Sequence, residues 1–312
     1  MNQPLVSIIV LNWNGWKDTI ECLDSLSKLT YTNYRIIVVD NGSTDGSVIE
    51  IKDWIGRSGN ARTSMIELKE NVGYARGNNA GARFAIDDTK AKFIFILNND
   101  TVVNPDMLEP LVSAFGSDDK VALAGPKIID YNTGKFWQGP AIRRFNLFSY
   151  LIFLTPLYRF FVKTPLLKMY LAQGEKPLKV YGVPGCAMFF RSDHFKKIGL
   201  FDETTFLYWE EYIIAEKLLA AGLDTLFVPY SKIRHKVSAS VDKIEALEKT
   251  LYTLQAEKYF QERYFKAGLM TRSFIRLVRS FIYLVYSIFD RDYRRNLSRI
   301  FGIIYGRSEH GG

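Results

Sequence analysis

The chain contains little cysteine, and what it has does not suggest a structural pair. Cys22 and Cys186 are the only two cysteines in 312 residues. They are too few and too far apart in sequence for a disulfide framework or a zinc site. We therefore expect both thiols to be reduced, as in a cytoplasmic protein.

Long apolar runs and the common glycine-rich phosphate motifs are also missing. The N-terminal residues include no basic region, and no segment reaches the roughly 18–20 apolar residues that a membrane-spanning helix needs. We expect neither a signal peptide nor a spanning helix. No GxGxxG follows the first apolar run and no GxxxxGK[ST] occurs, so neither a dinucleotide-binding fold nor a P-loop enzyme is supported.

What the chain does have is an excess of positive charge and many aromatic residues. Lysine and arginine number 41 against 33 aspartates and glutamates, a formal net charge of +8, and aromatic residues make up 14%. This balance favours an anionic partner, which could be nucleic acid, an anionic membrane or a phosphorylated substrate.

Short apolar segments alternate with helical patterns over the first 110 residues or so. The pattern predicts strands at 5–11, 35–40, 64–68 and 93–97. It predicts helices at 16–29, from the GSTDGS stretch to Ile55, and at 74–86. This alternation predicts an α/β fold with a doubly wound, mostly parallel sheet flanked by helices. Further on we expect strands near 121–136, 180–191 and 225–228, helices at 207–222 and 244–267, and an irregular insertion at 137–179.

Polar side chains gather where the predicted strands end. Each cluster alone is typical of turns and helix caps. In a parallel sheet, however, the carboxyl ends of the strands share one edge, and ligands of open α/β sheets bind there. The clusters contain Asn12, Asp40, Asn41, Asn98, Asn99 and Asp100, and Arg76 and Asn79 lie on the helix that follows Asn71.

Several motifs in order resemble those of glycosyltransferase family 2. They are VSIIVLNWNG, VVDNGSTDGS, ENVGYARGNNAGAR, FIFILNNDTVVNPDML, VPGCAMFFR with IGLFDE, and LYWEE with IRH. They look most like the bacterial rhamnosyltransferase-like branch that acts in cell-surface polysaccharide synthesis. The resemblance covers about residues 4–240. It implies a GT-A fold, a dTDP- or UDP-sugar donor such as dTDP-rhamnose, Mg²⁺ or Mn²⁺, inversion at the anomeric carbon, and a glycan or lipid-linked acceptor.

The resemblance divides the chain into domains. Residues 1–240 would form the catalytic domain, with a nucleotide-binding half at 1–110 and an acceptor half at 111–240 that contains the insertion. Residues 241–312 would form a basic, aromatic helical extension.

The resemblance also assigns the donor and metal residues. Asp100 matches the metal-binding acid of the family's DxD-like motif, and His235 matches a residue that often completes the metal site. Asp40 would accept a hydrogen bond from the pyrimidine N3–H, which uracil and thymine share. Each of these residues also has a simpler alternative. Asp100 could cap a helix, Asp40 could form a turn, and His235 could be an ordinary surface or core residue. The remaining donor-binding candidates are Asn12, Asn41, Arg76, Asn79, Asn98 and Asn99.

The family's acidic pair corresponds to Glu210 and Glu211. Glu211 would be the general base that takes the proton of the acceptor hydroxyl, and Glu210 would bind acceptor hydroxyls beside it. Two acids at a helix start are otherwise favourable dipole residues. Trp209 would stack on the acceptor sugar or belong to the core, and Asp202 would lie near the acceptor or cap a turn.

The region 270–305 reads as an amphipathic, basic helix. Its composition predicts an interfacial helix, with the apolar side in the acyl boundary and arginines on anionic headgroups. The protein would then be peripheral on the inner face of the cell membrane. The alternative is packing on the catalytic domain or in a homodimer. The stripe contains Phe274, Leu277, Phe281, Leu284, Val285 and Ile288, and the arginines are Arg272, Arg276, Arg279, Arg291, Arg294, Arg295 and Arg299.

A competing class is a non-catalytic module that binds nucleic acid or membrane, since basic charge with interleaved aromatics can serve RNA. A groove lined by Asp40, Asp100, Glu210 and Glu211 would repel phosphates, however, so we expect no nucleic-acid partner.

Overall fold

The computed structural model describes residues 3–59, 61–116, 118–136, 144–153, 176–236 and 244–306. The insertion predicted at 137–179 lies largely outside these residues. The described chain forms two compact units. The sheet unit contains 3–136 with its gaps, 176–206 and 210–236, and the helical unit contains 144–153, 207–209 and 244–306. The predicted division after residue 240 remains a prediction, to which the structure adds that 144–153 and 207–209 belong to the helical unit.

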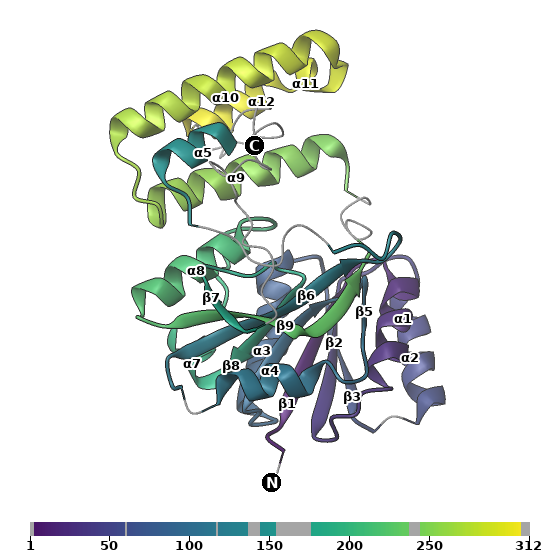
Figure 1. Ribbon diagram of the computed structural model, residues 1–312. Coiled ribbons are helices and arrows are strands. Elements are labelled where there is room, and N and C mark those ends of the chain that lie inside the picture. Colours follow the sequence, from purple (N-terminus) through teal and green to yellow (C-terminus); the bar gives the residue numbers. More distant parts are fainter. Residues whose placement is uncertain are drawn as a thin grey trace. The chain divides into compact units, whose positions relative to one another are not determined.

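The first half of the sheet unit has the predicted alternation of strands and helices (Figure 1). Strands β3, β2, β1 and β4 lie side by side in this order, and neighbouring strands are parallel. The strands are β1 (Val6–Asn12), β2 (Tyr34–Asn41), β3 (Thr63–Leu68) and β4 (Phe93–Asn98), and the helices between them are α1 (Trp16–Leu26), α2 (Ser47–Ser58) and α3 (Tyr74–Asp87).

The second half adds antiparallel strands to the predicted, mostly parallel sheet and so makes it mixed. The strand order is β3-β2-β1-β4-β8-β6-β9-β5, with β7 paired to β9. β8 runs antiparallel to both β4 and β6. The strands are β5 (Thr101–Val103), β6 (Val121–Asp130), β7 (Leu178–Val180), β8 (Ala187–Arg191) and β9 (Asp224–His235), and the helices are α4 (Leu108–Phe115), α7 (Ser192–Lys197) and α8 (Glu210–Ala220).

The strand predicted at 225–228 is much longer than expected. β9 continues to His235, and from Tyr230 onward its residues alternate between exposed and buried. The prediction missed this part because the stretch YSKIRH has a polar composition, whereas the alternation of a half-buried strand requires only every second residue to be buried.

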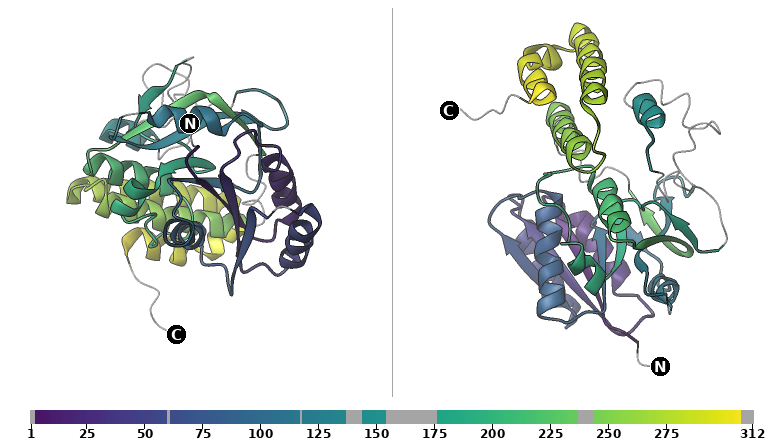
Figure 2. Two further views of the ribbon diagram at one scale, coloured as in Figure 1. Left: turned by 90° about the horizontal axis from the view of Figure 1, so that it is seen from below. Right: turned by 90° about the vertical axis from the view of Figure 1, so that its left-hand side faces the viewer.

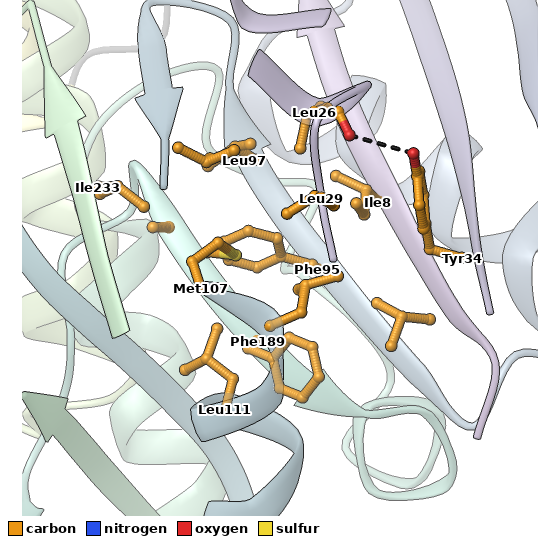
Figure 3. Close-up of a cluster of buried hydrophobic side chains, with 14 of the residues drawn as sticks. Ile8, Leu26, Leu29, Tyr34, Phe95, Leu97, Met107, Leu111, Phe189 and Ile233 are labelled. Carbon is orange, nitrogen blue, oxygen red and sulfur yellow. Dashed lines mark hydrogen bonds between the residues drawn. The ribbon is translucent and has the colours of Figure 1, made fainter. Parts of the chain in front are cut away.

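Helices cover both faces of the sheet. On one face Ile8, Ile36 and Phe95 form a core with α1, α2 and α4, and on the other Ile9 and Ile96 form a core with α3, α7 and α8. Successive strand residues alternate between the two cores, which is why the strands read as continuous apolar runs. Figure 3 shows part of the first core.

One polar group in this core is satisfied locally. The Tyr34 hydroxyl donates to the carbonyl oxygen of Leu26 at 3.1 Å, as the dashed line in Figure 3 marks. A buried hydroxyl without a partner would cost stability, so this bond allows Tyr34 to contribute its ring to the core.

In the helical unit, the C-terminal helices drawn in yellow lie side by side (Figure 2). Leu251, Leu254, Tyr283, Ile300 and Ile304 form its core. No helix in the described ranges is both long and apolar enough to cross a membrane. The helices are α5 (Leu147–Phe153), α9 (Ala246–Arg263), α10 (Leu269–Phe289), α11 (Arg291–Arg295) and α12 (Leu297–Tyr305).

Candidate active site

Register brings the polar strand ends of the sheet unit together. Asn12 lies opposite Asp40, and Leu11 lies opposite Asn98. Asn12 Nδ2 donates to Asp40 Oδ1 at 2.7 Å, and the Ser43 backbone N–H donates to Asp40 Oδ2 at 2.9 Å. Asp40 is buried, but each carboxylate oxygen can accept a second bond. Ser43 was not singled out from the sequence, where it reads as one more turn residue.

Asn12 and Asn99 belong to a buried scaffold. Thr19 Oγ1 donates to Asn12 Oδ1 at 2.8 Å, and Asn99 Nδ2 donates to Thr19 Oγ1 at 3.0 Å. These bonds connect β1, α1 and the turn after β4. Asn98, by contrast, is partly exposed, and its backbone N–H donates to Cys186 O at 2.9 Å.

Asn41 shapes the turn that leads into α3. Its Oδ1 accepts from the Val72 N–H at 3.0 Å, and its Nδ2 donates to Asn71 Oδ1 at 2.8 Å. Gly73 in this turn has φ of +86°, and a Cβ there would lie 2.4 Å from Phe206 O. Only glycine fits this backbone and this close approach.

Asn79 and Arg76, both candidates for donor binding, contact the protein segment 201–203. Asn79 Nδ2 donates to Phe201 O at 3.0 Å and to Glu203 Oε1 at 2.8 Å, and its Oδ1 accepts from the Phe201 N–H at 3.0 Å. Arg76 Nε donates to Glu203 O at 3.2 Å. Both ends of the Asn79 amide hold residues 201–203 on α3. Asn79 is therefore not among the donor contacts that we propose.

Asp100 and His235 meet at the end of the sheet. His235 Nε2 lies 3.1 Å from Asp100 Oδ1, and the two side chains are 10% and 3% exposed. His235 is the last residue of β9 and pairs with Thr101 of β5. Burial lowers the pKa of His235, but Cys186 and Asp100 outweigh this effect and raise the pKa to about 10.

This pair offers a cation one carboxylate oxygen and, when the cation replaces the proton that Asp100 stabilises on His235, one imidazole nitrogen. Among the residues that the structure describes, no group of three or more histidine, cysteine or acidic side chains could hold a metal ion. The donor set therefore fits a Mg²⁺ or Mn²⁺ ion that takes most of its ligands from phosphates and water.

Glu210 and Glu211 begin α8, and each has an Oε2 atom that is buried without a hydrogen-bond partner. Burial raises the pKa of both carboxyls. The pKa of Glu210 rises further because of the charge of Glu211 and because Glu210 is the donor in their mutual hydrogen bond. The two carboxyls therefore share a buried site in which both resist ionisation more than a free carboxyl does.

Tyr74, which was not singled out from the sequence, lies within electrostatic reach of these acids. Its hydroxyl donates to Gly185 O at 2.7 Å. Burial raises the Tyr74 pKa well above its usual value, and the charges of Glu210, Cys186, Glu211 and Asp100 raise it further. The carboxyl of Glu210 also lies against Gly185, where a Cβ would be 3.0 Å from Glu210 Oε1. In the sequence Tyr74 resembles an ordinary aromatic residue at a helix start.

The two acceptor candidates are engaged by protein groups. Trp209 is 6% exposed in the helical unit, with its ring centroid 4.9 Å from that of Phe260. Trp209 is therefore a core residue of the helical unit, and we do not propose that it stacks on the acceptor sugar. Asp202 Oδ1 accepts from the Thr204 N–H at 3.0 Å, as in a capped turn. Tyr208 and Trp209 both have positive φ, 71° and 68°, a strained entry into α8 of the kind that is common at functional sites.

The class to which the fold belongs is clear from solved structures. The chain matches the mannosyltransferase PcManGT from Pyrobaculum calidifontis, solved with GDP-Man and Mn²⁺, with a TM-score of 0.58 and 14% identity over 98% of this chain and 86% of that one. It also matches GalNAc-T7, solved with UDP, GalNAc and Mn²⁺, with a TM-score of 0.57 and 20% identity over 75% and 44%. The fold is GT-A.

The chain belongs to glycosyl transferase family 2, whose model matches residues 7–199. It is 24% identical over 261 residues to the N-acetylglucosaminyl-diphospho-decaprenol L-rhamnosyltransferase of Mycobacterium tuberculosis, which covers 76% of this chain and 79% of that one. Glycosyltransferase GlyG of Streptococcus pneumoniae is 33% identical over 121 residues, 39% and 38% of the two chains. The chain spans about half the length of several other curated relatives.

Proposed function

We propose that this chain is a metal-dependent, inverting glycosyltransferase. It transfers a sugar from a dTDP- or UDP-sugar to a hydroxyl of a glycan or lipid-linked acceptor in cell-surface polysaccharide synthesis. The observation that supports this best is that Tyr74, Glu210 and the end of β4 all contact Gly185 or Cys186 at the edge of a family 2 sheet. Rhamnose and a lipid-diphosphate acceptor are suggested by the mycobacterial relative, a rhamnosyltransferase named for a diphospho-decaprenol acceptor.

The donor would bind along the ends of β1, β2 and β4. Asp40, held by Asn12 and Ser43, would accept the N3–H of uracil or thymine. Asp100 and His235 would hold the Mg²⁺ or Mn²⁺ ion, which when bound would neutralise charge on the diphosphate. Asn98, partly exposed at the end of β4, would contact the ribose or the sugar.

Glu211 would act as the general base. It matches the second acid of the family's pair, and burial raises its pKa toward neutrality, so it would take a proton from the acceptor hydroxyl during attack on the anomeric carbon. Glu210 would bind an acceptor hydroxyl beside Glu211. Because this attack displaces the diphosphate in one step from the opposite side, the anomeric configuration inverts.

We further propose that the apolar stripe of α10 docks on a membrane surface, peripheral and cytoplasmic. The stripe consists of Met270, Phe274, Leu277, Phe281, Leu284 and Ile288, spaced three and four residues apart along a helix of 21 residues and all exposed, from 46% to 88%. A straight apolar face of this length suits the flat boundary between headgroups and acyl chains. A homodimer through the same face is the alternative.

Several of the arginines that were predicted to bind headgroups have partners within the helical unit. Arg279 is paired with Glu257 at 2.6 Å, and Arg299 with Glu248 at 2.9 Å. Arg294 donates to the carbonyl oxygens of Ser287 and Ile288. These arginines therefore stabilise the helical unit through its glutamates and helix-end carbonyl groups. Arg291 and Arg295 are exposed, so we expect apolar burial to dominate membrane binding.

Thermal unfolding with ligands tests the enzymatic class. UDP or dTDP with Mn²⁺ should raise the unfolding temperature of the full chain, since a ligand that binds only the native state stabilises it. A single-stranded RNA oligonucleotide should leave the temperature unchanged. Stabilisation by RNA and none by either nucleotide would favour the nucleic-acid module instead.

A further inference from the structure

The helical unit contains a groove with more cations than its acids can balance. It lies between α9 and α10, and Ile304 of α12 borders it. We call it the basic groove. Its charged lining consists of Glu257, Lys258, Glu262, Arg272, Arg276 and Arg279.

Two of these charges neutralise each other. Arg279 and Glu257 form an ion pair of 2.6 Å, with side chains that are 14% and 2% exposed. Glu257 also accepts a hydrogen bond of 2.9 Å from the Tyr150 hydroxyl. A buried pair of this kind is satisfied internally, and removing either partner would be costly. It serves as the floor of the groove and leaves the other charges to be explained.

The remaining three cations face a single carboxylate. Glu262 Oε1 lies 3.8 Å from both the Arg272 Nη1 and the Arg276 Nη2 atoms, too far for a hydrogen bond to either. Arg272 Nε is buried and has no hydrogen-bond partner. Within the described ranges, no hydrogen bond or ion pair involves the Lys258 ammonium, which lies beside Gly306 at the end of α12.

We propose that the basic groove binds a phosphate or diphosphate group. Two guanidinium groups and an ammonium are the donors that recognise phosphate oxygens, and a guanidinium can offer two parallel bonds. A phosphate dianion would supply the acceptors that Arg272 and Arg276 lack and would offset the excess charge. The group could belong to a lipid headgroup or to a soluble phosphorylated molecule. Its lining belongs to the helical unit, whereas the proposed donor residues belong to the sheet unit, and the proposal does not depend on the proposed reaction.

Inorganic pyrophosphate, titrated calorimetrically into the full chain in EDTA, is the first probe. Arg272→Gln with Arg276→Gln should weaken its binding at least about tenfold, because each charge-assisted bond contributes more than a neutral one. Arg291→Gln with Arg295→Gln removes the same charge from exposed positions and should have little effect. Glu262→Gln should strengthen binding, since it removes the competing carboxylate. Lys258→Gln, on α9, tests the groove independently if the double variant does not fold.

Vesicles of phosphatidylcholine with or without phosphatidic acid are the second probe, in a sedimentation assay. A loss in the groove variant with phosphatidic acid alone supports the site with a lipid headgroup as the source, and a loss with pyrophosphate supports a soluble one. Unchanged binding of both probes in the groove variants, or no binding of either by the wild-type chain, would overturn the proposal.

Discussion

Glu210 and Glu211 have the same chemistry and adjacent positions, but we propose different roles for them, with Glu211 as the base and Glu210 bound to the acceptor. Glu211→Gln keeps the shape of the side chain and removes the proton acceptor. Turnover should fall by roughly 10²–10⁴, the usual contribution of general base catalysis, whereas donor affinity should stay near the wild-type value. Initial rates over a range of donor concentrations give both quantities.

Glu210→Gln is the matched variant, because it changes the acceptor-binding partner and leaves the base. It should retain more turnover than Glu211→Gln. If Glu210→Gln is inactive and Glu211→Gln active, the assignment within the pair is reversed.

The raised pKa of this pair also predicts opposite effects of pH on rate and stability. A base works only when it is ionised, so turnover should fall as pH drops through a pKa above the ordinary 4.5. A carboxyl with a raised native pKa binds its proton more tightly when folded. Its contribution to stability is therefore present below the unfolded pKa and lost as pH rises through the folded pKa.

Glu210→Gln should accordingly raise the unfolding temperature at pH 8 and change it little at pH 4. Unfolding scans at the two pH values measure this difference. A variant that is equally destabilised at both would show that the Glu210 carboxylate is not under strain.

Asp100 is predicted to act through the cation. Asp100→Ala should abolish transfer and also remove the part of nucleotide binding that requires Mn²⁺, while the fold stays intact. Asp106→Ala is the control, because Asp106 is an exposed acid on the same segment. Titration of UDP or dTDP with and without Mn²⁺ gives the readout, and full wild-type activity in excess EDTA would contradict a metal requirement.

At the scale of elements, α10 carries the prediction about the membrane. Phe274→Ser with Phe281→Ser removes apolar area from side chains that are 51% and 69% exposed, so the unfolding temperature should change little. Pelleting with vesicles should drop sharply. Ile49→Ser with Leu219→Ser is the control, since these exposed apolar residues lie on helices of the sheet unit.

Salt should weaken pelleting of the wild-type chain only in part, because the burial of apolar surface does not depend on ionic strength. Equal pelleting of the stripe variant and the wild type would exclude the stripe as the membrane contact. Loss of a dimer in the stripe variant, measured by analytical ultracentrifugation, would favour the homodimer.

The elements also show what local sequence could and could not predict. β1, β2 and β4 were found because both faces of each strand are buried, which leaves an apolar run in the sequence. The polar half of β9 was missed because its neighbours, not its composition, decide which of its residues are buried. The arginines of α10 were read as surface charges, since their glutamate partners on α9 lie 10 to 22 positions away.

At the scale of the whole molecule, the family and the fold could be predicted because the motifs lie at strand ends and the sheet edge gathers them. Asp40, Asp100 and His235 were named in this way, and the structure brings Asp100 and His235 into contact. The contacts of Tyr74 and Asn79 could not be predicted from the sequence, because their partners Gly185 and Glu203 are more than 100 residues away. Long-range contacts of this kind leave no local pattern.

Above all, we propose that the chain uses a UDP- or dTDP-sugar as its donor. The most direct measurement is the release of nucleoside diphosphate from a panel of UDP-, dTDP- and CDP-sugars by the full chain with Mn²⁺. We predict slow release from at least one UDP- or dTDP-sugar, dependent on Asp100, and none from CDP-sugars, because cytosine has no N3–H for Asp40 to accept. Release that is equal from CDP-sugars, or that persists unchanged in Asp100→Ala, would contradict the account.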